Sequence, residues 1–165
     1  MKITFIQTGG TIDKDYPRLT KGYAFEITEP ALNSILDDIA PNFEYDVIAL
    51  MQKDSLYITT EDRLKIKELC QKTEAKSIII THGTDTMIET AEVLSTIKGK
   101  VIIITGAMRP EKFKNSDASF NVGTAIGAVN VLTEGVYIAM NGRIYSWDKC
   151  RRNTETGQFV EGRLG

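Results

Sequence analysis

Short apolar runs constrain the fold of this 165-residue chain more than any other feature of its sequence. Each run is five to seven residues long and contains Ile or Val. Segments whose apolar residues recur at helical spacing lie between them. Strands of this kind, alternating with helices, predict a parallel sheet that helices cover on both faces. The strands are expected at 3–7, 45–51, 77–81, 101–105 and 136–140, and the helices near 29–39, 60–73, 86–97 and 117–133.

The fold class is therefore expected to be α/β, a doubly wound and mostly parallel three-layer sheet with a β-hairpin toward the C-terminus. The dipeptide 141–142, Asn-Gly between two β-rich runs, is a strong hairpin signal. Thr28 is expected to cap the helix at 29–39, and Thr59 with Asp62 forms a capping-box pattern. Residues 13–27 read as irregular, and the polar tail from Asn153 as loosely held.

Composition narrows the class of protein. A length of 165 residues predicts one domain, and a formal net charge of −2 gives no electrostatic footprint for nucleic acid or an anionic membrane. The single His and the two distant Cys residues indicate neither a metal site nor a disulfide framework. No apolar stretch is long enough to span a membrane, and the N-terminus reads as a strand without a signal sequence. A reduced, cytoplasmic protein is expected.

Three loops that follow predicted strands are rich in Gly and Thr. They lie at 8–11, 81–85 and 105–110. Because ligands of doubly wound sheets bind at the carboxyl ends of the strands, these loops are the candidate site. None matches GxGxxG or the GxxxxGK[ST] phosphate loop, so the pattern does not favour nucleotide binding.

The loop after the third strand contains more polar side chains than a helix start needs. Thr86 and Glu89 fit a capping box, which leaves Thr84 and Asp85 without a role in capping. A Thr at a strand end becomes a nucleophile only if a base takes its proton, and a Lys with a lowered pKa can do so. Asp85 could hold that Lys or bind a substrate ammonium, and both residues could simply satisfy the turn. Thr11 takes the equivalent place after the first strand.

Four motifs carry a family resemblance. TGGTID at 8–13, THGTDTM at 81–87, TGAMRP at 105–110 and NSDASFN at 115–121 resemble the N-terminal domain of the bacterial-type L-asparaginases. That family includes the asparaginase-like subunit of an archaeal tRNA amidotransferase. The resemblance covers about residues 2–152, and it implies one asparaginase N-terminal-like domain over 1–165. It also implies hydrolysis of the side-chain amide of asparagine or a related small amide through a Thr acyl-enzyme, with no cofactor and no metal.

The resemblance assigns roles to individual residues. Thr11 is the first nucleophile, and its partner is a Tyr on the following loop, best matched by Tyr23, with Tyr16 as the second choice. Thr84 and Asp85 correspond to the second nucleophile and to the carboxylate that contacts the substrate α-amino group. Three further residues belong to the substrate-binding loops, where backbone N–H groups would stabilise an oxyanion. They are Gly10, Gly83 and Ala107.

Three departures from the family pattern raise alternatives. The loop at 52–55 lacks the substrate-binding Ser at its expected place and brings Lys53 and Asp54 instead, both taken as candidate substrate-binding residues. The family's catalytic Lys aligns either with Lys149, across a three-residue gap, or with Arg152, which cannot act as a base. The second domain of the family is absent from 1–165. We therefore expect one of two arrangements. Either a homo-oligomer completes the cleft, or the chain is a non-catalytic module that binds aspartate or asparagine or serves as a subunit.

Two other residues are assigned structural roles. The ordinary pKa of a His side chain would suit a general base, and His82 is the single His. The resemblance instead makes it a structural residue of the turn. Ser116 or Asp117 is expected to cap the helix at 117–133.

Overall fold

The computed structural model describes residues 1–18 and 24–162, and its centre is a six-stranded sheet of order β4-β1-β5-β6-β7-β8. The first five strands in this order are parallel, and β8 pairs antiparallel with β7. This confirms the predicted doubly wound α/β class. The strands are β1 (Lys2–Gly9), β4 (Glu44–Lys53), β5 (Ser77–Thr81), β6 (Val101–Thr105), β7 (Gly135–Met140) and β8 (Arg143–Ser146).

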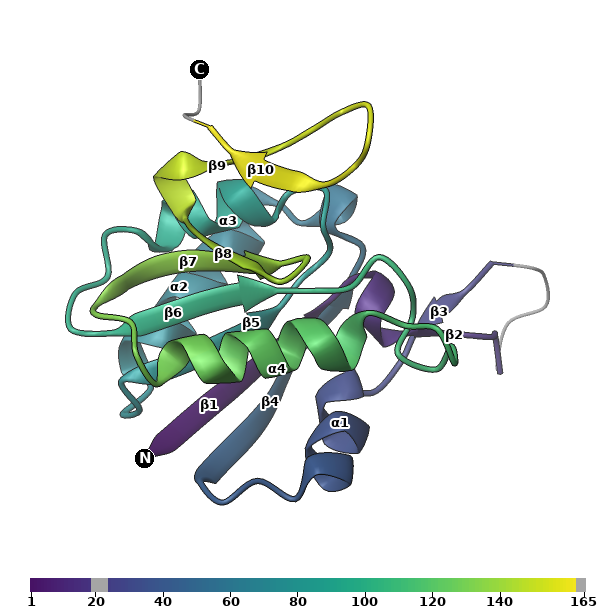
Figure 1. Ribbon diagram of the computed structural model, residues 1–165, viewed down its shortest axis with the longest axis horizontal. Helices are drawn as coiled ribbons and strands as arrows, with labels where there is room; N and C mark the ends of the chain where they lie inside the picture. The colour runs from purple at the N-terminus through teal and green to yellow at the C-terminus, as the bar shows by residue number, and fades with distance from the viewer. Residues whose placement is uncertain (19–23, 163–165) are drawn as a thin grey trace.

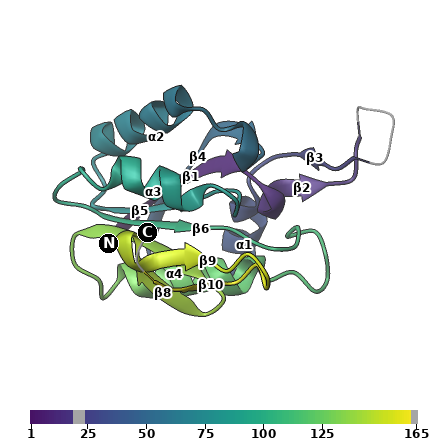
Figure 2. The same cartoon turned by 90° about the horizontal axis from the view of Figure 1, so that it is seen from above.

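Helices cover both faces of the sheet, as the predicted three-layer arrangement requires. Figure 2 shows α2 (Thr60–Lys72) and α3 (Met87–Leu94) on one side of the strands, with α1 (Ala31–Ile39) and α4 (Ala118–Val129) on the other. Within the described ranges, no helix combines the length and the apolar composition that crossing a bilayer requires.

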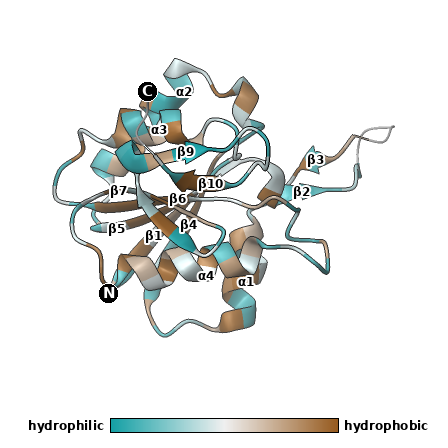
Figure 3. Ribbon diagram, turned by 45° about the horizontal axis from the view of Figure 1, so that its top comes forward, coloured by the Kyte–Doolittle hydropathy of each residue, from teal (hydrophilic) through white to brown (hydrophobic). Residues whose placement is uncertain are grey.

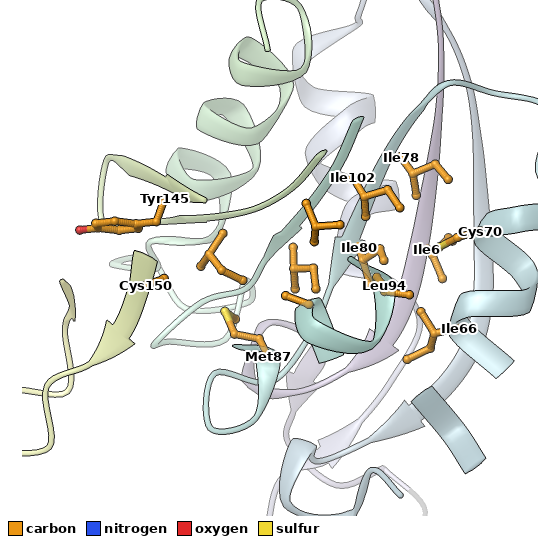
Figure 4. Packing of buried hydrophobic residues seen from close by; sticks show 14 of the residues in the cluster. Ile6, Ile66, Cys70, Ile78, Ile80, Met87, Leu94, Ile102, Tyr145 and Cys150 are labelled. Atoms are coloured by element: carbon orange, nitrogen blue, oxygen red, sulfur yellow. The ribbon is translucent and has the colours of Figure 1, made fainter. Parts of the chain in front are cut away.

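The inner strands β1, β5, β6 and β7 are buried on both faces, which explains why their sequences are nearly continuous apolar runs. Ile78 and Ile80 belong to the core under α2 and α3, whereas Ile79 between them belongs to the core under α1 and α4. Figure 4 shows Ile66 and Cys70 of α2 packed toward the sheet. Figure 3 shows the same pattern as hydrophobic central strands between helices with mixed faces.

The two helix caps turn out differently. The Thr59–Asp62 capping box is confirmed, with both reciprocal hydrogen bonds present at the start of α2. The predicted Thr28 cap of α1 is wrong, because Pro30 takes the N-cap position. The Asp13 side chain, from a distant segment, instead accepts a hydrogen bond of 2.8 Å from Ala31 N.

The segment predicted to be irregular contains short regular elements. A 3-10 turn, η1 (Thr11–Asp13), follows β1, and β2 (Lys14–Asp15) pairs antiparallel with β3 (Glu26–Ile27). In Figure 1 this ribbon projects from the side of the molecule. Another 3-10 turn, η2 (Ser55–Tyr57), lies in the loop after β4. Two-residue strands carry too little periodicity to be recognised in a sequence.

The predicted hairpin at 141–142 is confirmed as the β7–β8 turn, with positive φ at both Asn141 and Gly142. The prediction of a loosely held tail is wrong as far as residue 162. After η3 (Trp147–Lys149), β9 (Cys150–Arg152) pairs with β10 (Phe159–Glu161). Buried Phe159 and the Tyr145 hydroxyl, which donates to Phe159 O at 2.8 Å, attach this ribbon to the core.

Candidate functional site

The loops singled out in the sequence meet at one edge of the sheet. After β1 the chain runs to β4 on one side, and it then crosses to β5 on the other side of β1. This reversal makes the carboxyl ends of β1 and β5 a topological switch point, where doubly wound sheets bind their ligands. The loops after β1, β4 and β5 surround that point.

Glycines bring these loops into backbone contact. A Cβ atom on Gly10 would lie 2.5 Å from both the Cα and N atoms of Gly83. A Cβ atom on Gly83 would lie 2.6 Å from the Cβ and Oγ atoms of Ser55, and one on Gly106 would collide with the carbonyl oxygen of His82. Three separate loops therefore pack against the 81–85 segment at distances that exclude a side chain.

Thr11 and Thr84 lie on two of the loops held together in this way. Thr11 opens η1 directly after Gly10, whose N–H donates to Lys53 O at 3.0 Å. Both threonine side chains are partly exposed. Among the described residues, neither hydroxyl has a hydrogen-bond partner, so both remain available to a ligand.

Asp85 is paired with a residue from the C-terminal ribbon. Arg152 of β9 donates from Nη1 to Asp85 Oδ1, and its Nε donates to Gly157 O at 3.2 Å. Lys149 lies on η3 with an exposed side chain, and no ion pair joins it to another described residue. The structure therefore brings Arg152, and not Lys149, into contact with Asp85.

The loop after β4 commits its charged residues to contacts within the protein. Lys53 Nζ lies 2.6 Å from Asp62 Oδ2, in the capping box of α2, and this lowers the pKa of Asp62 to about 2. Asp54 Oδ2 lies 3.0 Å from Lys14 Nζ, and its Oδ1 accepts from Leu56 N. Burial would raise the pKa of Asp54, but these two donors outweigh it and lower the pKa.

Ser55 is a candidate that the sequence interpretation passed over. Its side chain is 1% exposed and sits against Gly83, yet its Oγ has no hydrogen-bond partner among the described residues. A buried hydroxyl without a partner is uncommon in a stable structure, which makes Ser55 a candidate for a role beyond packing. The sequence could have identified Ser55 by its position, one residue after Asp54 and just past the end of a strand next to the switch point.

The predicted capping box at Thr86 and Glu89 is wrong in its hydrogen bonding. Thr86 takes the N-cap position of α3 without a side-chain capping bond. Its hydroxyl donates to Ser55 O at 2.8 Å instead. Thr86 therefore links the 81–85 loop to η2 and helps to hold Ser55 in place.

His82 supports the 81–85 loop from within the core. It is fully buried, and its Nδ1 lies 2.8 Å from Gly83 O, which can only accept, so Nδ1 carries the proton. Nε2 then accepts from Thr90 Oγ1 at 2.8 Å, and Arg63 Nε donates to Thr90 Oγ1 at 3.1 Å. Burial lowers the pKa of His82 to about 4, so the ring is neutral near pH 7.

The loop after β6 is fixed by the start of α4. Asp117 takes the N-cap position of α4, but its carboxylate accepts from the N–H groups of Met108 and Arg109, each at 3.0 Å, and from the Asn121 side-chain amide, rather than from a backbone N–H of the helix. Ser116 Oγ accepts from Ala118 N. Ala107 is 1% exposed and packs in the core cluster under α1 and α4.

Of the two candidate tyrosines, Tyr23 falls outside the described residues. Tyr16 is exposed, and its ring packs edge-on against Phe25 at 5.3 Å between centroids.

Other chemistries have weaker support at this site. Burial raises the pKa values of the Cys70 and Cys150 thiols to about 12, which keeps both protonated and poorly nucleophilic. In the described part of the chain, no group of three or more His, Cys, Asp or Glu side chains is arranged to hold a metal ion. The groups gathered at the switch point are hydroxyls, carboxylates and backbone N–H groups.

Comparisons with known proteins bear on the same region. The family model for the asparaginase N-terminal domain matches residues 2–159. L-asparaginase 2 of Escherichia coli is 34% identical over 166 residues, covering 92% of this chain and 47% of that protein. A glutamyl-tRNA(Gln) amidotransferase subunit of Methanococcus vannielii is 32% identical over 150 residues, covering 86% and 34% of the two chains.

Solved structures agree with the architecture. The thermostable L-asparaginase from Thermococcus kodakarensis superimposes with a TM-score of 0.84 at 26% identity, over 98% of this chain and 51% of that one. The chain thus spans between a third and about half of the length of these relatives.

Proposed function

The chain belongs to the asparaginase family, which it matches through the family's N-terminal domain, and from this premise we propose that it is an amidohydrolase. Its substrate is the side-chain amide of asparagine or a related small amide, and the reaction passes through a Thr acyl-enzyme. The L-asparaginase and glutaminase-asparaginase relatives support the class of reaction.

The observation that carries the proposal is the contact between Gly10 and Gly83. It places the Thr11 loop against the Thr84 loop at the switch point, where both hydroxyls are free of hydrogen bonds to other described residues. Such an arrangement gives a substrate amide a hydroxyl nucleophile beside a turn rich in backbone N–H groups.

In the proposed reaction Thr11 Oγ attacks the amide carbon and forms a tetrahedral oxyanion. Backbone N–H groups of Thr11 and Thr84, with Gly10 and Gly83 allowing close approach, stabilise that charge. The C–N bond then breaks, the amide nitrogen leaves as ammonia after taking a proton, and Thr11 carries an ester. Water hydrolyses the ester, which releases the carboxylate product and restores the hydroxyl. Tyr23, with Tyr16 as the second choice, is proposed to take the proton from Thr11 and to pass it to the leaving nitrogen.

Thr84 and Asp85 are the proposed supporting set; Lys149, which the family resemblance adds to it, is exposed, and Arg152 contacts Asp85 in its stead. A guanidinium beside Asp85 cannot remove a proton from Thr84, because Arg stays protonated. A base role for Lys149 requires its exposed side chain to reach across the ribbon. We therefore assign the first attack to Thr11 and a binding role to Thr84 and Asp85.

Substrate binding is assigned to the walls of the switch point. The Ser55 hydroxyl, buried beside Gly83 and without a partner among the described residues, would donate to a substrate only after the loop after β4 shifts and exposes it. Asp54, paired with Lys14, and Ala107, buried in the core, stay candidates only because they belong to the loops after β4 and β6. Lys53 would contribute a positive charge only after leaving Asp62.

The test is ammonia release from asparagine, glutamine and small aliphatic amides. Wild type, Thr11→Val, Thr84→Val and Ser119→Ala are compared, the last being an exposed hydroxyl on α4 that serves as a matched control. The proposal requires release by wild type and by Ser119→Ala, with a loss of at least about 100-fold in Thr11→Val. Equal background rates in all four proteins would remove it.

A second candidate is favoured by the Asp85–Arg152 pair itself. With an Arg beside Asp85, the fold could bind aspartate or asparagine without turnover, as a binding module or as a subunit of a larger enzyme. The similarity to an amidotransferase subunit is consistent with the subunit role. Calorimetric binding of aspartate without ammonia release would favour this candidate.

Two further properties follow from the family. We propose that a second copy of the chain, in a homo-oligomer, covers the partly exposed side chains of Thr11 and Thr84. A cytoplasmic location is proposed from the reduced thiols and from similarity to a probable cytoplasmic L-asparaginase of Campylobacter jejuni.

A further inference from the structure

Asp13, two residues after Thr11, sits at the junction of four segments. Its N–H donates to Gly10 O, and its carbonyl accepts from both the N–H and the hydroxyl of Thr28. Its carboxyl Oδ1 accepts from Ala31 N at 2.8 Å. The 3-10 turn that carries Thr11 is therefore tied through Asp13 to the end of β3 and the start of α1.

The other carboxyl oxygen lacks a donor. Asp13 is 3% exposed, and Oδ2 has no hydrogen-bond partner among the described residues. The same holds for two neighbouring acceptors, Gln7 Oε1 and Glu111 Oε2. The Gln7 amide lies against the Asp13 carboxyl, while its Nε2 is used in a bond of 2.8 Å to Thr28 O. Buried acceptors without any donor are costly, so a proton is missing from this cluster.

Solvent does not reach these atoms in the folded structure. Each of the three oxygens has less than 1 Å² of accessible surface, so a water in the adjoining cavity would contact them only after a local rearrangement. A proton on the carboxyl needs no rearrangement. It converts Oδ2 from an unsatisfied acceptor into a donor toward the free oxygen of the Gln7 amide.

We propose that Asp13 is a positioning residue that holds the Thr11 turn in its protonated form, donating from Oδ2 to Gln7 Oε1. Ionisation replaces that hydrogen bond with repulsion between buried oxygens, which loosens the turn. Because the folded state keeps this proton at pH values where the unfolded chain has already lost it, stability falls as the pH rises from about 4 toward the folded-state pKa of Asp13, and activity falls as the carboxyl ionises. The link to activity rests on the proposed function, whereas the link to stability does not.

The charges around Asp13 act in the same direction or are already paired. Glu111, on the loop after β6, adds negative charge next to it, and Lys112 lies 3.8 Å from Glu111 Oε2. Lys14 is paired with Asp54. Burial is the main reason that the pKa of Asp13 is raised to about 7, and it outweighs the neighbouring Ala31 N–H and Gln7 amide, which lower the pKa. Glu29 and Asp37 also line the adjoining cavity, of about 170 Å³.

The test combines carboxyl titration with thermal unfolding. In protein labelled with ¹³C at the Asp side chains, one carboxyl signal should titrate near pH 7 and should be absent from Asp13→Asn. The Asn side chain mimics the protonated acid, because its oxygen accepts from Ala31 N and its amide donates to Gln7. From pH 5 to pH 8, the Tm of wild type should therefore fall by several degrees more than the Tm of Asp13→Asn.

Asp37→Asn is the matched control, because it removes an exposed carboxylate at the same cavity and should keep the wild-type pH dependence. An Asp13 signal that titrates below pH 5 would overturn the proposal, and this result needs no folded variant. Equal Tm profiles in wild type and Asp13→Asn would also overturn it. If amide hydrolysis is found, kcat/KM of wild type should decline above pH 7 while that of Asp13→Asn does not. If no hydrolysis is found, the titration and the Tm comparison still decide the question.

Discussion

Gly10 and Gly83 touch through their backbones, and a methyl group on Gly10 would lie 2.5 Å from Gly83 Cα. Gly10 also has a φ of 91°, which L side chains rarely adopt. We therefore predict that Gly10→Ala separates the Thr11 and Thr84 loops. Unfolding should require at least about 2 kcal/mol less free energy, and any amide hydrolysis should fall to background. Urea unfolding and ammonia release measure the two effects.

Gly123→Ala is the control for this prediction. Gly123 lies on α4 with nothing within 4 Å of an added Cβ, and its φ is not positive. The substitution should stabilise the helix by about 0.5–1 kcal/mol and leave activity unchanged. If Gly10→Ala behaves like Gly123→Ala, the close contact of the two loops contributes to neither stability nor activity.

A second prediction concerns Lys53 and Asp62. Because Lys53 holds the pKa of Asp62 at about 2, the folded state binds fewer protons than the unfolded state between about pH 2 and pH 4. This stabilisation is complete above about pH 4 and is lost as the pH falls toward 2. Lys53→Met should lower the free energy of unfolding at pH 7 by about 1 kcal/mol. It should also reduce the loss of stability that wild type shows as the pH falls from about 4 to about 2. Chemical denaturation at several pH values measures it.

The same variant tests whether Lys53 binds substrate. If its role is only to pair with Asp62, Lys53→Met should leave KM within about twofold of wild type. A tenfold rise in KM, about 1.4 kcal/mol of binding, would return Lys53 to the substrate site.

The sequence predicted the strands well because their apolar runs reflect burial on both faces. The runs at 77–81 and 101–105 became β5 and β6 with the same bounds. It also predicted that the Gly- and Thr-rich loops meet at the carboxyl ends of the strands, since the position of loops in a doubly wound sheet follows from strand order. The Thr59–Asp62 box was predicted correctly because both of its partners lie within four residues of each other.

What the sequence did not reveal depends on contacts between distant segments. The cap of α1 comes from Asp13, 18 residues away, and the Thr86 hydroxyl turns to Ser55, 31 residues away. The choice between Lys149 and Arg152 beside Asp85 likewise depended on how the β9–β10 ribbon folds back. Local propensity carries no information about such partners.

A third prediction uses the single His of the chain. Since burial lowers the pKa of His82 to about 4, its imidazole should stay neutral, with the proton on Nδ1, from pH 8 down to about pH 5. ¹⁵N NMR of His-labelled protein gives one pair of ring signals, so the assignment is direct. A ring that titrates near pH 6.5, or one protonated at Nε2, would contradict the hydrogen bonds that join Arg63, Thr90 and His82.

Thr90 allows a matched pair of variants in that arrangement. Thr90→Val removes the hydroxyl between Arg63 and His82 and should cost about 1–3 kcal/mol, because it leaves buried polar groups unpaired. Thr90→Ser keeps the hydroxyl and should recover most of the loss. Equal losses in both variants would indicate that packing of the methyl group, rather than the hydrogen bonds, is what matters.

A fourth prediction separates Arg152 from Lys149. Arg152→Gln removes the ion pair with Asp85 and should lower kcat/KM for asparagine by at least tenfold, whereas Lys149→Gln should change it by less than twofold. Steady-state kinetics on both variants measure the difference. The opposite pattern would make Lys149 the functional base.

The central claim is that Thr11 carries the acyl group, and trapping the intermediate tests it most directly. Wild type mixed with asparagine or another hydrolysed amide is quenched in acid within milliseconds, digested, and analysed by mass spectrometry. We predict an ester on the peptide that contains Thr11, absent from Thr11→Val and retained in Thr84→Val. An acyl group found on Thr84 instead, or turnover that persists in Thr11→Val, would contradict it.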